Sequence, residues 1–332
     1  MKKRIGLIGT GRVGKVHAQS VFEENRAELA ITADVFVEGS KSVSEAFGGD
    51  FTANPLDVFN SEKVDLVIIA SPTSTHVDLI EAAIDSGIPA ICEKPIDLDI
   101  AKVEALAKKV SKSKTPIMIG FNRRFDPAVM ELHRLTQAGA IGSLEQLSIV
   151  SRDPSPASMD YLRASGGIFR DMTIHDFDMA RNFIPDIVRV TARGFNQFDE
   201  EIAKIPDFDS TSIILEGADG QSIQITNSRH SASGFDQRIE AFGSEGMLRM
   251  ENLSESTIRL YDRDHTEKKA PWLNFFLERH AQSFRNELAS FLSVLEGSDI
   301  PYPSFDDGRK ALILANAALE SAMTEKTIEI SG

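Results

Sequence analysis

The stretch RIGLIGTGRVG, residues 4–14, decides the fold of the first part of the chain. Its apolar residues IGLI predict a buried strand. Gly9, Gly11 and Gly14 come directly after this strand, where a turn leads into a helix predicted over 12–24. Glycines at this spacing allow a tight turn and let the backbone approach a pyrophosphate at the N-terminus of the helix. The stretch therefore predicts a strand, a phosphate-binding turn and a helix.

An acidic residue follows at the distance that a dinucleotide site needs. The second predicted strand, LAITAD, ends at Asp34, twenty residues after Gly14. A carboxylate there can accept hydrogen bonds from the ribose diol of adenosine and would repel a 2′-phosphate, so NAD is favoured over NADP. The alternative is a tight strand-to-helix turn that binds no ligand, since a glycine loop alone is a weak signal.

Short apolar runs continue to alternate with amphipathic stretches up to about residue 120. The further predicted elements are strands in LVIIA (66–70), PAICE (89–93) and PIMIG (116–120), with helices over 75–86 and 99–112. This alternation predicts a parallel sheet covered by helices on both faces. Ligands of such sheets bind at the carboxyl ends of the strands, so site residues are expected there.

From about residue 144 the pattern changes to longer runs in which apolar and polar residues alternate. The runs are LEQLSIVSR, VRVTARGFNQF, STSIILEG, QSIQITNSR, QRIEAFGS, GMLRMEN and STIRLYD. They predict an antiparallel sheet, with hairpin turns in GADG (217–220) and GSEG (243–246). Helices predicted over 167–184 and 274–296 would cover one face of this sheet.

These patterns predict an α/β fold with two domains, in keeping with a length of 332 residues. Residues 1–120 are expected to form a Rossmann domain with a doubly wound parallel sheet. Residues 121–332 are expected to form an α+β domain with a large, mainly antiparallel open sheet, used for substrate binding and oligomerisation. A last helix is predicted over 307–323, before the short strand TIEI, and the prediction includes that this helix can pack on the Rossmann domain.

Composition argues against several classes of protein. A formal net charge of -14 disfavours nucleic acids and anionic membranes as partners. No run reaches the roughly 18 apolar residues of a membrane span, and the N-terminus enters a strand without a signal-peptide core. The single cysteine, Cys92, excludes an intrachain disulfide and lies in a predicted buried strand, although a nucleophilic role is the alternative. We expect a globular cytoplasmic protein.

The segment GGIFRDMTIHDFD, residues 166–178, places Asp171 and His175 one helical turn apart. A carboxylate at this spacing can hold an imidazole in one tautomer, which makes the pair a candidate for acid-base chemistry. The alternative is an ordinary pair on a solvated helix face. A metal site is disfavoured because only two ligands share the face. Asp176 and Asp178 are expected to be ion-paired or solvated.

Strand-end residues Cys92-Glu93-Lys94-Pro95 add a second motif, EKP, downstream of the glycine loop. The combination resembles the glucose-fructose oxidoreductase and inositol dehydrogenase (Gfo/Idh/MocA) family over nearly the whole chain. The segments GFNRRFDP (120–127), SRDP (151–154), GGIFRDMTIHDFDMAR (166–181) and DQR (236–238) are similar to those of its bacterial myo-inositol 2-dehydrogenases.

The resemblance implies three catalytic residues, Lys94, Asp171 and His175. Lys94 would bridge the nicotinamide ribose and the reacting hydroxyl, the alternative being an exposed loop lysine. His175 would be the general base and Asp171 would orient its ring. The residues expected to contact the cofactor NAD are Gly9, Gly11, Arg12, Val13, Gly14, Asp34, Ser71, Thr73, His76, Glu93 and Lys94. Those expected to contact the substrate are Lys94, Arg123, Asp153, Asp171 and His175.

Some of these assignments carry alternatives. Thr73 and His76 could instead be a helix cap and an exposed histidine. Arg124, next to Arg123, could pair with a carboxylate. The resemblance also implies a cis peptide bond before Pro95.

The chain departs from the family in SASGFDQR, where Ser233 and Phe235 replace tyrosines found in many inositol dehydrogenases. The loss of a phenol can change which hydroxyl or which epimer is preferred. The leading expectation is NAD-dependent oxidation of a cyclic polyol, from myo-inositol to 2-keto-myo-inositol (scyllo-inosose). The alternatives are another inositol isomer or sugar, and a non-catalytic dinucleotide sensor. The family suggests a homotetramer that buries the uncovered face of the second sheet.

Overall fold

The computed structural model describes residues 1–60 and 62–330. The chain divides into two compact units. Unit 1 comprises Met1–Asp126 and Ala281–Leu312, and unit 2 comprises Pro127–His280 and Ile313–Gly332. Each unit is described below by itself.

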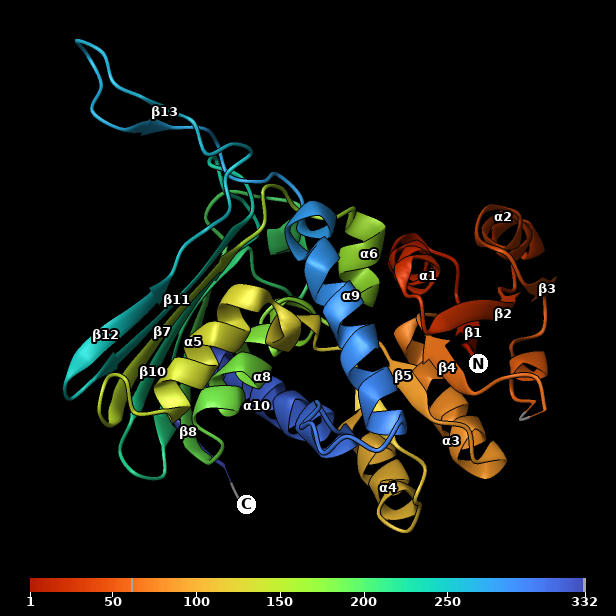
Figure 1. The fold of residues 1–332 in the computed structure, drawn as a ribbon. Coiled ribbons are helices and arrows are strands. Elements are labelled where there is room, and N and C mark those ends of the chain that lie inside the picture. The colour runs from red at the N-terminus through yellow and green to blue at the C-terminus, as the bar shows by residue number, and fades with distance from the viewer. Residues whose placement is uncertain (61, 331–332) are drawn as a thin grey trace. The chain divides into compact units, whose positions relative to one another are not determined.

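Unit 1 contains a six-stranded sheet in the order β3-β2-β1-β4-β5-β6 (Figure 1). Its strands are β1 (Lys3–Ile8), β2 (Ala27–Ala33), β3 (Asp50–Thr52), β4 (Leu66–Ile69), β5 (Ala90–Cys92) and β6 (Ile117–Ile119). All the pairings are parallel. The chain starts in the middle and winds outward in both directions, which confirms the predicted Rossmann sheet. The order reverses between β1 and β4, where ligands of such sheets bind.

Helices surround this sheet. They are α1 (Arg12–Glu23), α2 (Val37–Phe47), α3 (His76–Ser86), α4 (Ile100–Val110) and, from the end of the chain, α9 (Phe276–Leu295) and the start of α10 (Phe305–Thr324). The prediction that the helix over 274–296 covers the second sheet is wrong for most of its length. Leu288, Phe291 and Leu292 of α9 pack in one cluster with β1 and α1, because the apolar face of α9 fits the Rossmann core.

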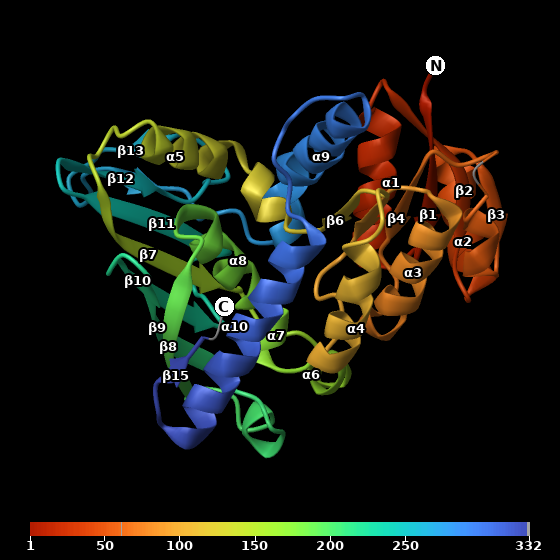
Figure 2. The same ribbon diagram turned by 90° about the horizontal axis from the view of Figure 1, so that it is seen from below.

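Unit 2 contains a seven-stranded sheet in the order β12-β11-β7-β10-β9-β8-β15 (Figure 2). Its strands are β7 (Leu144–Arg152), β8 (Ile187–Phe195), β9 (Ser210–Gly217), β10 (Ser222–Ser228), β11 (Asp236–Gly243), β12 (Gly246–Met250) and β15 (Ile328–Glu329). Only β7 and β10 pair in parallel. The predicted open, mainly antiparallel sheet is confirmed, and the hairpins at 217–220 and 243–246 join β9 to β10 and β11 to β12.

One face of this sheet is covered by helices α5 (Pro127–Gln137) and α8 (Ile174–Phe183) and by the end of α10, which Figures 1 and 2 show on the same side. Leu132, Phe177 and Leu314, one from each helix, lie in the same buried cluster as the inward side chains of the strands. Large apolar side chains remain exposed elsewhere on the sheet strands. They are Phe195, Ile214, Phe242 and Met247.

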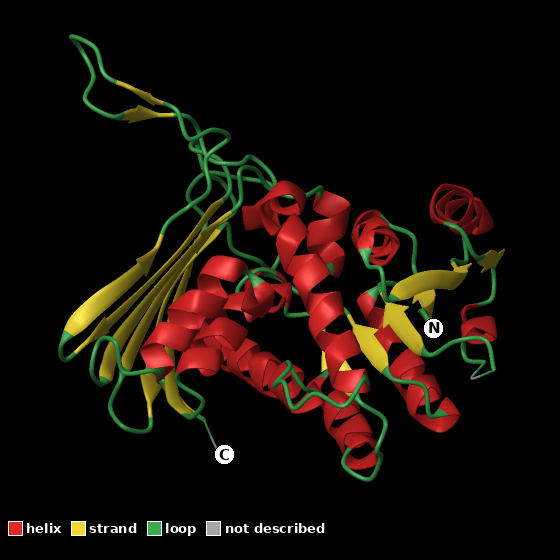
Figure 3. Ribbon diagram, in the orientation of Figure 1, coloured by secondary structure: helices red, strands yellow, loops and turns green. Residues whose placement is uncertain are grey.

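Two local predictions differ from the structure. The helix predicted over 167–184 forms as two, α7 (Ile168–Asp171) and α8. The run STIRLYD is a strand only in β13 (Arg259–Leu260), which pairs with β14 (Lys268–Lys269) in the long hairpin of Figure 3. This segment is rich in charged residues, and residues 256–270 are exposed or half-buried, so little packing holds a longer strand. Among the described helices, none has the length and apolar character to cross a membrane.

Candidate functional site

The glycine loop of unit 1 has a backbone that only glycine fits. Gly9 has φ +91°, and a Cβ there would lie 2.5 Å from the carbonyl oxygen of Ala70. A Cβ on Gly14 would lie 2.0 Å from the carbonyl oxygen of Gly9. Gly11 caps α1 without a side-chain hydrogen bond, and its Cβ position is open space. The loop can therefore bring a diphosphate against the helix N-terminus.

Asp34 joins this loop to the end of β2. Its Oδ2 accepts hydrogen bonds from the backbone N and the hydroxyl of Thr10, both at 2.8 Å, and its Oδ1 accepts one from the N of Phe36 at 2.9 Å. Partial burial raises the pKa of Asp34, but these hydrogen bonds outweigh it and hold the pKa below its usual value. The carboxylate is therefore a fixed anionic acceptor beside the glycine loop, which fits an adenosine ribose diol and disfavours a 2′-phosphate. Arg12 and Val13 follow at the start of α1.

His76 links two loops of unit 1. Its Nδ1 lies 2.8 Å from the carbonyl oxygen of Pro95, and its Nε2 lies 2.9 Å from that of Ser71. The side chain is buried, so the alternative of an exposed histidine is wrong. Thr73 begins a short 3-10 turn that leads into α3. His76 therefore fixes the loop after β4 to the EKP loop after β5.

Glu93 and Lys94 follow β5 directly. The Lys94–Pro95 peptide bond is cis, as the resemblance implied. Glu93 Oε1 lies 2.8 Å from Nε2 of His17, a buried residue of α1. A Cβ on Gly120 would lie 3.2 Å from the Glu93 carboxylate, so glycine leaves room for it. These contacts hold the backbone next to Lys94.

A second carboxyl group is buried near Glu93. Glu287 of α9 has no solvent exposure, and neither of its oxygens has a hydrogen-bond partner within residues 1–60 and 62–330. Burial, with a contribution from the charge of Glu93, raises the pKa of Glu287 well above its usual range. Burial raises the pKa of the Cys92 thiol in the same way, which confirms that Cys92 is a buried strand residue and disfavours a nucleophilic role.

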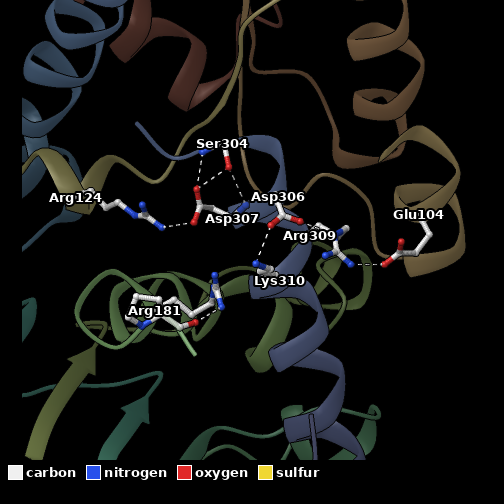
Figure 4. Close-up of polar contacts among 9 residues, drawn as sticks. Glu104, Arg124, Arg181, Ser304, Asp306, Asp307, Arg309 and Lys310 are labelled. Carbon is white, nitrogen blue, oxygen red and sulfur yellow. Dashed lines mark hydrogen bonds and ion pairs between the residues drawn. The ribbon is translucent and has the colours of Figure 1, made fainter. Parts of the chain in front are cut away.

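Arg123 and Arg124 lie in a 3-10 turn after β6, and both are half-buried. Nη2 of Arg124 lies 3.1 Å from Oδ1 of Asp307, and Oδ2 of Asp307 accepts hydrogen bonds from the backbone N and the hydroxyl of Ser304 (Figure 4). Burial raises the pKa of Asp307, but Arg124 and Ser304 outweigh it and lower the pKa overall. Arg124 is thus tied to the start of α10, as one alternative allowed.

In unit 2, the Asp171 carboxylate is held from two sides. Its Oδ1 accepts a hydrogen bond of 2.7 Å from the hydroxyl of Tyr161 in the short helix α6 (Met159–Ala164). Its Oδ2 lies 3.6 Å from Nη1 of Arg229. Arg229 is buried, and its Nη2 lies 2.9 Å from Oδ2 of buried Asp207. Asp207 in turn accepts the backbone N–H of Ile168 at the start of α7.

Asp153 belongs to the same group of charges. It follows β7, and its backbone N donates to the carbonyl oxygen of Ser228 at the end of β10. Because β7 and β10 are parallel neighbours, Asp153 and Arg229 emerge at the same edge of the sheet. The charges of Asp171, Arg229 and Asp153 all act on the Tyr161 phenol. We call Tyr161, Asp153, Asp171, Asp207 and Arg229 the Asp171 cluster.

His175 lies in the first turn of α8, above a buried polar network. Its backbone N donates to the carbonyl oxygen of Met172, in the break between α7 and α8. Asp176 next to it is fully buried and accepts hydrogen bonds of 2.6 Å from Ser151 and from Asn227. Asp178 is buried as well, so of the two states expected for these residues, ion-paired or solvated, the solvated one is wrong. The cause is the packing of α8 on the sheet.

The expected site residues are thus distributed over both units. The cofactor candidates, Lys94 and Arg123 belong to unit 1, whereas Asp153, Asp171 and His175 belong to unit 2. Phe235, which replaces a family tyrosine, is buried and packs edge-on against His280, with ring centroids 5.6 Å apart. In the described part of the chain, no three His, Cys, Asp or Glu side chains are grouped to hold a metal ion.

Sequence reasoning missed five polar residues. They are His17, Tyr161, Asp207, Arg229 and Glu287. Their partners are far away in the sequence or in another helix, so no spacing pattern marks them. Their residue types and spacing are those of ordinary surface residues, as for Glu287, which follows Arg285 and Asn286 in α9.

Two family models together cover most of the chain. The model described as the oxidoreductase family with an NAD-binding Rossmann fold, GFO_IDH_MocA, matches residues 3–121, and that of the GFO/IDH/MocA C-terminal domain matches residues 129–249. An inositol 2-dehydrogenase of Rhizobium meliloti (strain 1021) is 42% identical over 100% of both chains.

Solved structures are similar over the full length. A myo-inositol dehydrogenase from Corynebacterium glutamicum superimposes with a TM-score of 0.96 at 48% identity, covering 100% of both chains. A scyllo-inositol dehydrogenase from Lactobacillus casei, with NAD(H) and scyllo-inositol bound, gives a TM-score of 0.91 at 27% identity, covering 99% of both chains.

Proposed function

The chain belongs to the GFO/IDH/MocA oxidoreductase family and is an NAD-dependent dehydrogenase, and from this premise we propose that it oxidises myo-inositol to 2-keto-myo-inositol (scyllo-inosose). The observation that carries the proposal is the Asp171 cluster, in which the Asp171 and Asp207 carboxylates flank the Arg229 guanidinium and the charge of Asp153 acts on the neighbouring Tyr161 phenol. A cluster rich in acceptors suits a substrate made of hydroxyl donors. The printed names of the relatives support the choice of inositol.

The residues of unit 1 fit NAD. The glycine loop would hold the diphosphate and Asp34 the adenosine ribose, with Ser71, Thr73, His76 and Glu93 along the neighbouring strand ends. NAD bound there supplies the hydride acceptor. Lys94 follows β5 and is proposed to bind the reacting hydroxyl, where its ammonium would stabilise the negative charge that develops on oxygen.

His175 is proposed to accept the proton of the hydroxyl that is oxidised. Asp171, four residues earlier, would orient the imidazole and stabilise its cation, as in other acid-base pairs. Arg123 and Asp153 are proposed to bind hydroxyls that do not react. Each role can be lost separately, which makes the assignments testable one residue at a time.

A panel of polyols with NAD, followed by NADH absorbance, tests the substrate. We expect the largest kcat/KM with myo-inositol and scyllo-inosose as the product by NMR. A preference for another inositol isomer or for a sugar would replace myo-inositol as the substrate. The absence of NADH formation with every polyol of the panel would overturn the assignment of a polyol as the substrate.

We also propose that the protein is a cytoplasmic homotetramer. The support is the set of exposed apolar residues on the sheet strands of unit 2, such as Ile214 and Met247, which a second copy would bury. A buried single cysteine suits a reducing compartment. Light scattering should give four times the chain mass, and Ile214→Asp should lower it. A monomer at micromolar concentration would contradict this assembly.

A further inference from the structure

Tyr161 presents a half-exposed ring whose hydroxyl is directed at a candidate catalytic carboxylate. The residue is 50% exposed, yet its hydroxyl donates a 2.7 Å hydrogen bond to Oδ1 of Asp171. Desolvation and the charge of Asp171 raise the pKa of the phenol, so it remains a neutral donor throughout the physiological range. The phenol oxygen keeps lone pairs that can accept a further hydrogen bond.

Resting on the function proposed above, we propose that Tyr161 determines which inositol isomer is oxidised, by sharing the Asp171 carboxylate with a substrate hydroxyl. The inference assigns Tyr161 to the polyol site, which neither the glycine loop nor the EKP and DMTIH motifs identify.

The geometry of the carboxylate explains how one hydrogen bond can select an isomer. An ionised carboxylate offers about four acceptor directions. Tyr161 takes one of them at Oδ1, and the Arg229 guanidinium lies 3.6 Å from Oδ2. A ring hydroxyl that binds Oδ1 of Asp171 would lie beside the phenol oxygen. Myo- and scyllo-inositol differ in the axial or equatorial position of one hydroxyl, so the two isomers would present that hydroxyl to Asp171 and Tyr161 from different directions.

Tyr161 is also distinguished from the other tyrosines of the chain by its contact. The chain has three tyrosines. Tyr261 is 66% exposed beyond β13, and Tyr302 stacks edge-on against Phe291 within unit 1. Tyr161 is the tyrosine whose hydroxyl meets a candidate catalytic residue in unit 2. It can therefore provide a phenol hydroxyl beside Asp171.

The test compares Tyr161→Phe with the matched control Tyr261→Phe, which removes the same hydroxyl from the exposed hairpin. For each enzyme, kcat and KM are measured with myo-inositol, scyllo-inositol and glucose, together with NAD affinity by fluorescence and Tm. We expect Tyr161→Phe to lower kcat/KM for the preferred polyol about 10- to 100-fold, the scale of one hydrogen bond to a charged group. The ratio of kcat/KM between the two inositols should fall with it, while NAD affinity and Tm stay within error of the parent.

The outcomes separate this proposal from the proposed function. If the parent enzyme oxidises inositols but Tyr161→Phe changes all polyols equally or not at all, the assignment of Tyr161 is wrong and the function stands. A fall in Tm with a uniform loss of kcat would show a purely structural role and also overturn it. If the parent oxidises a different polyol of the panel, the same ratio is measured for that polyol against its epimer. A parent that oxidises no polyol overturns both proposals.

Discussion

The cofactor site of unit 1 and the Asp171 cluster of unit 2 are assembled in different ways. In unit 1 the glycine loop and Asp34 follow two adjacent parallel strands and are joined directly, through the Thr10 hydrogen bonds. In unit 2 the Asp171 carboxylate meets Tyr161 from another helix and Arg229 from the end of β10. Strand ends in a parallel sheet bring nearby motifs together, whereas the mixed sheet of unit 2 must assemble its charges by tertiary packing.

Because of this difference, substitutions in the two sites should affect different properties of the protein. Loss of a residue in the glycine loop or at Asp34 should affect the binding of one ligand. Loss of a buried charge in the Asp171 cluster should affect both chemistry and folding, because Asp207 and Arg229 also hold the start of α7. The following predictions test this contrast.

Asp207→Ala should have the largest effect on stability. It removes the partner of a buried guanidinium, and Arg229 would then keep its charge with only the more distant Asp171 nearby. Breaking such a pair typically costs about 3–5 kcal/mol of unfolding free energy. Urea unfolding measures it, with Glu201→Ala, which breaks an exposed ion pair with Lys204, as the control. Equal losses in both variants would show that the buried pair contributes no more than a surface pair.

His175→Ala should lower kcat about 10²-fold or more, since a general base is lost, and leave NAD affinity nearly unchanged. Stopped-flow measurement of hydride transfer isolates the chemical step. His265→Ala, in the exposed hairpin beyond β13, is the control. Hydride transfer at the parent rate in His175→Ala would place the proton acceptor elsewhere.

Asp34→Ala should weaken NAD binding about 10- to 100-fold, the scale of hydrogen bonds to a charged group, and reduce the preference over NADP. The KM for the polyol should remain unchanged. Fluorescence titration with both dinucleotides measures it, and Glu45→Ala, an exposed acid of α2, is the control. If the parent itself binds NADP as well as NAD, Asp34 does not select the cofactor.

Glu287→Gln should change how the free energy of unfolding depends on pH, because the pKa of Glu287 is raised in the folded state. The folded state keeps this proton after the unfolded chain, with its pKa near 4.5, has released it. Stability from the neutral carboxyl is therefore fully present below that value and is lost as pH rises toward the folded pKa, by about 1.4 kcal/mol per pH unit.

The Gln variant has no proton to lose, so its stability should fall less than that of the parent between pH 5 and pH 8. Urea unfolding at both pH values measures the difference, and Glu278→Gln, exposed on the same helix, should follow the parent. Identical pH profiles for Glu287→Gln and the parent would show that Glu287 ionises as readily in the folded state. The experiment also bears on the comparison of the two units, because Glu287 belongs to unit 1 although it is far in the sequence from the strands of the Rossmann sheet.

The Rossmann sheet, the open sheet and the glycine loop with Asp34 could be predicted from the sequence alone. These features depend on periodicity and on short-range turns: Gly9 has a positive φ, and a Cβ on Gly14 would meet the carbonyl oxygen of Gly9 within the same turn. The cis bond before Pro95 was reached only through resemblance.

The remaining features depend on tertiary packing. It broke the helix carrying Asp171 and His175 into α7 and α8, and it moved α9 to the Rossmann core. It also brought Tyr161 and Arg229 to Asp171 and buried Glu287 near Glu93. The physical reason is that burial and ion pairing depend on which distant surfaces pack together, and a charged residue has the same local pattern whether it ends in solvent or in a core.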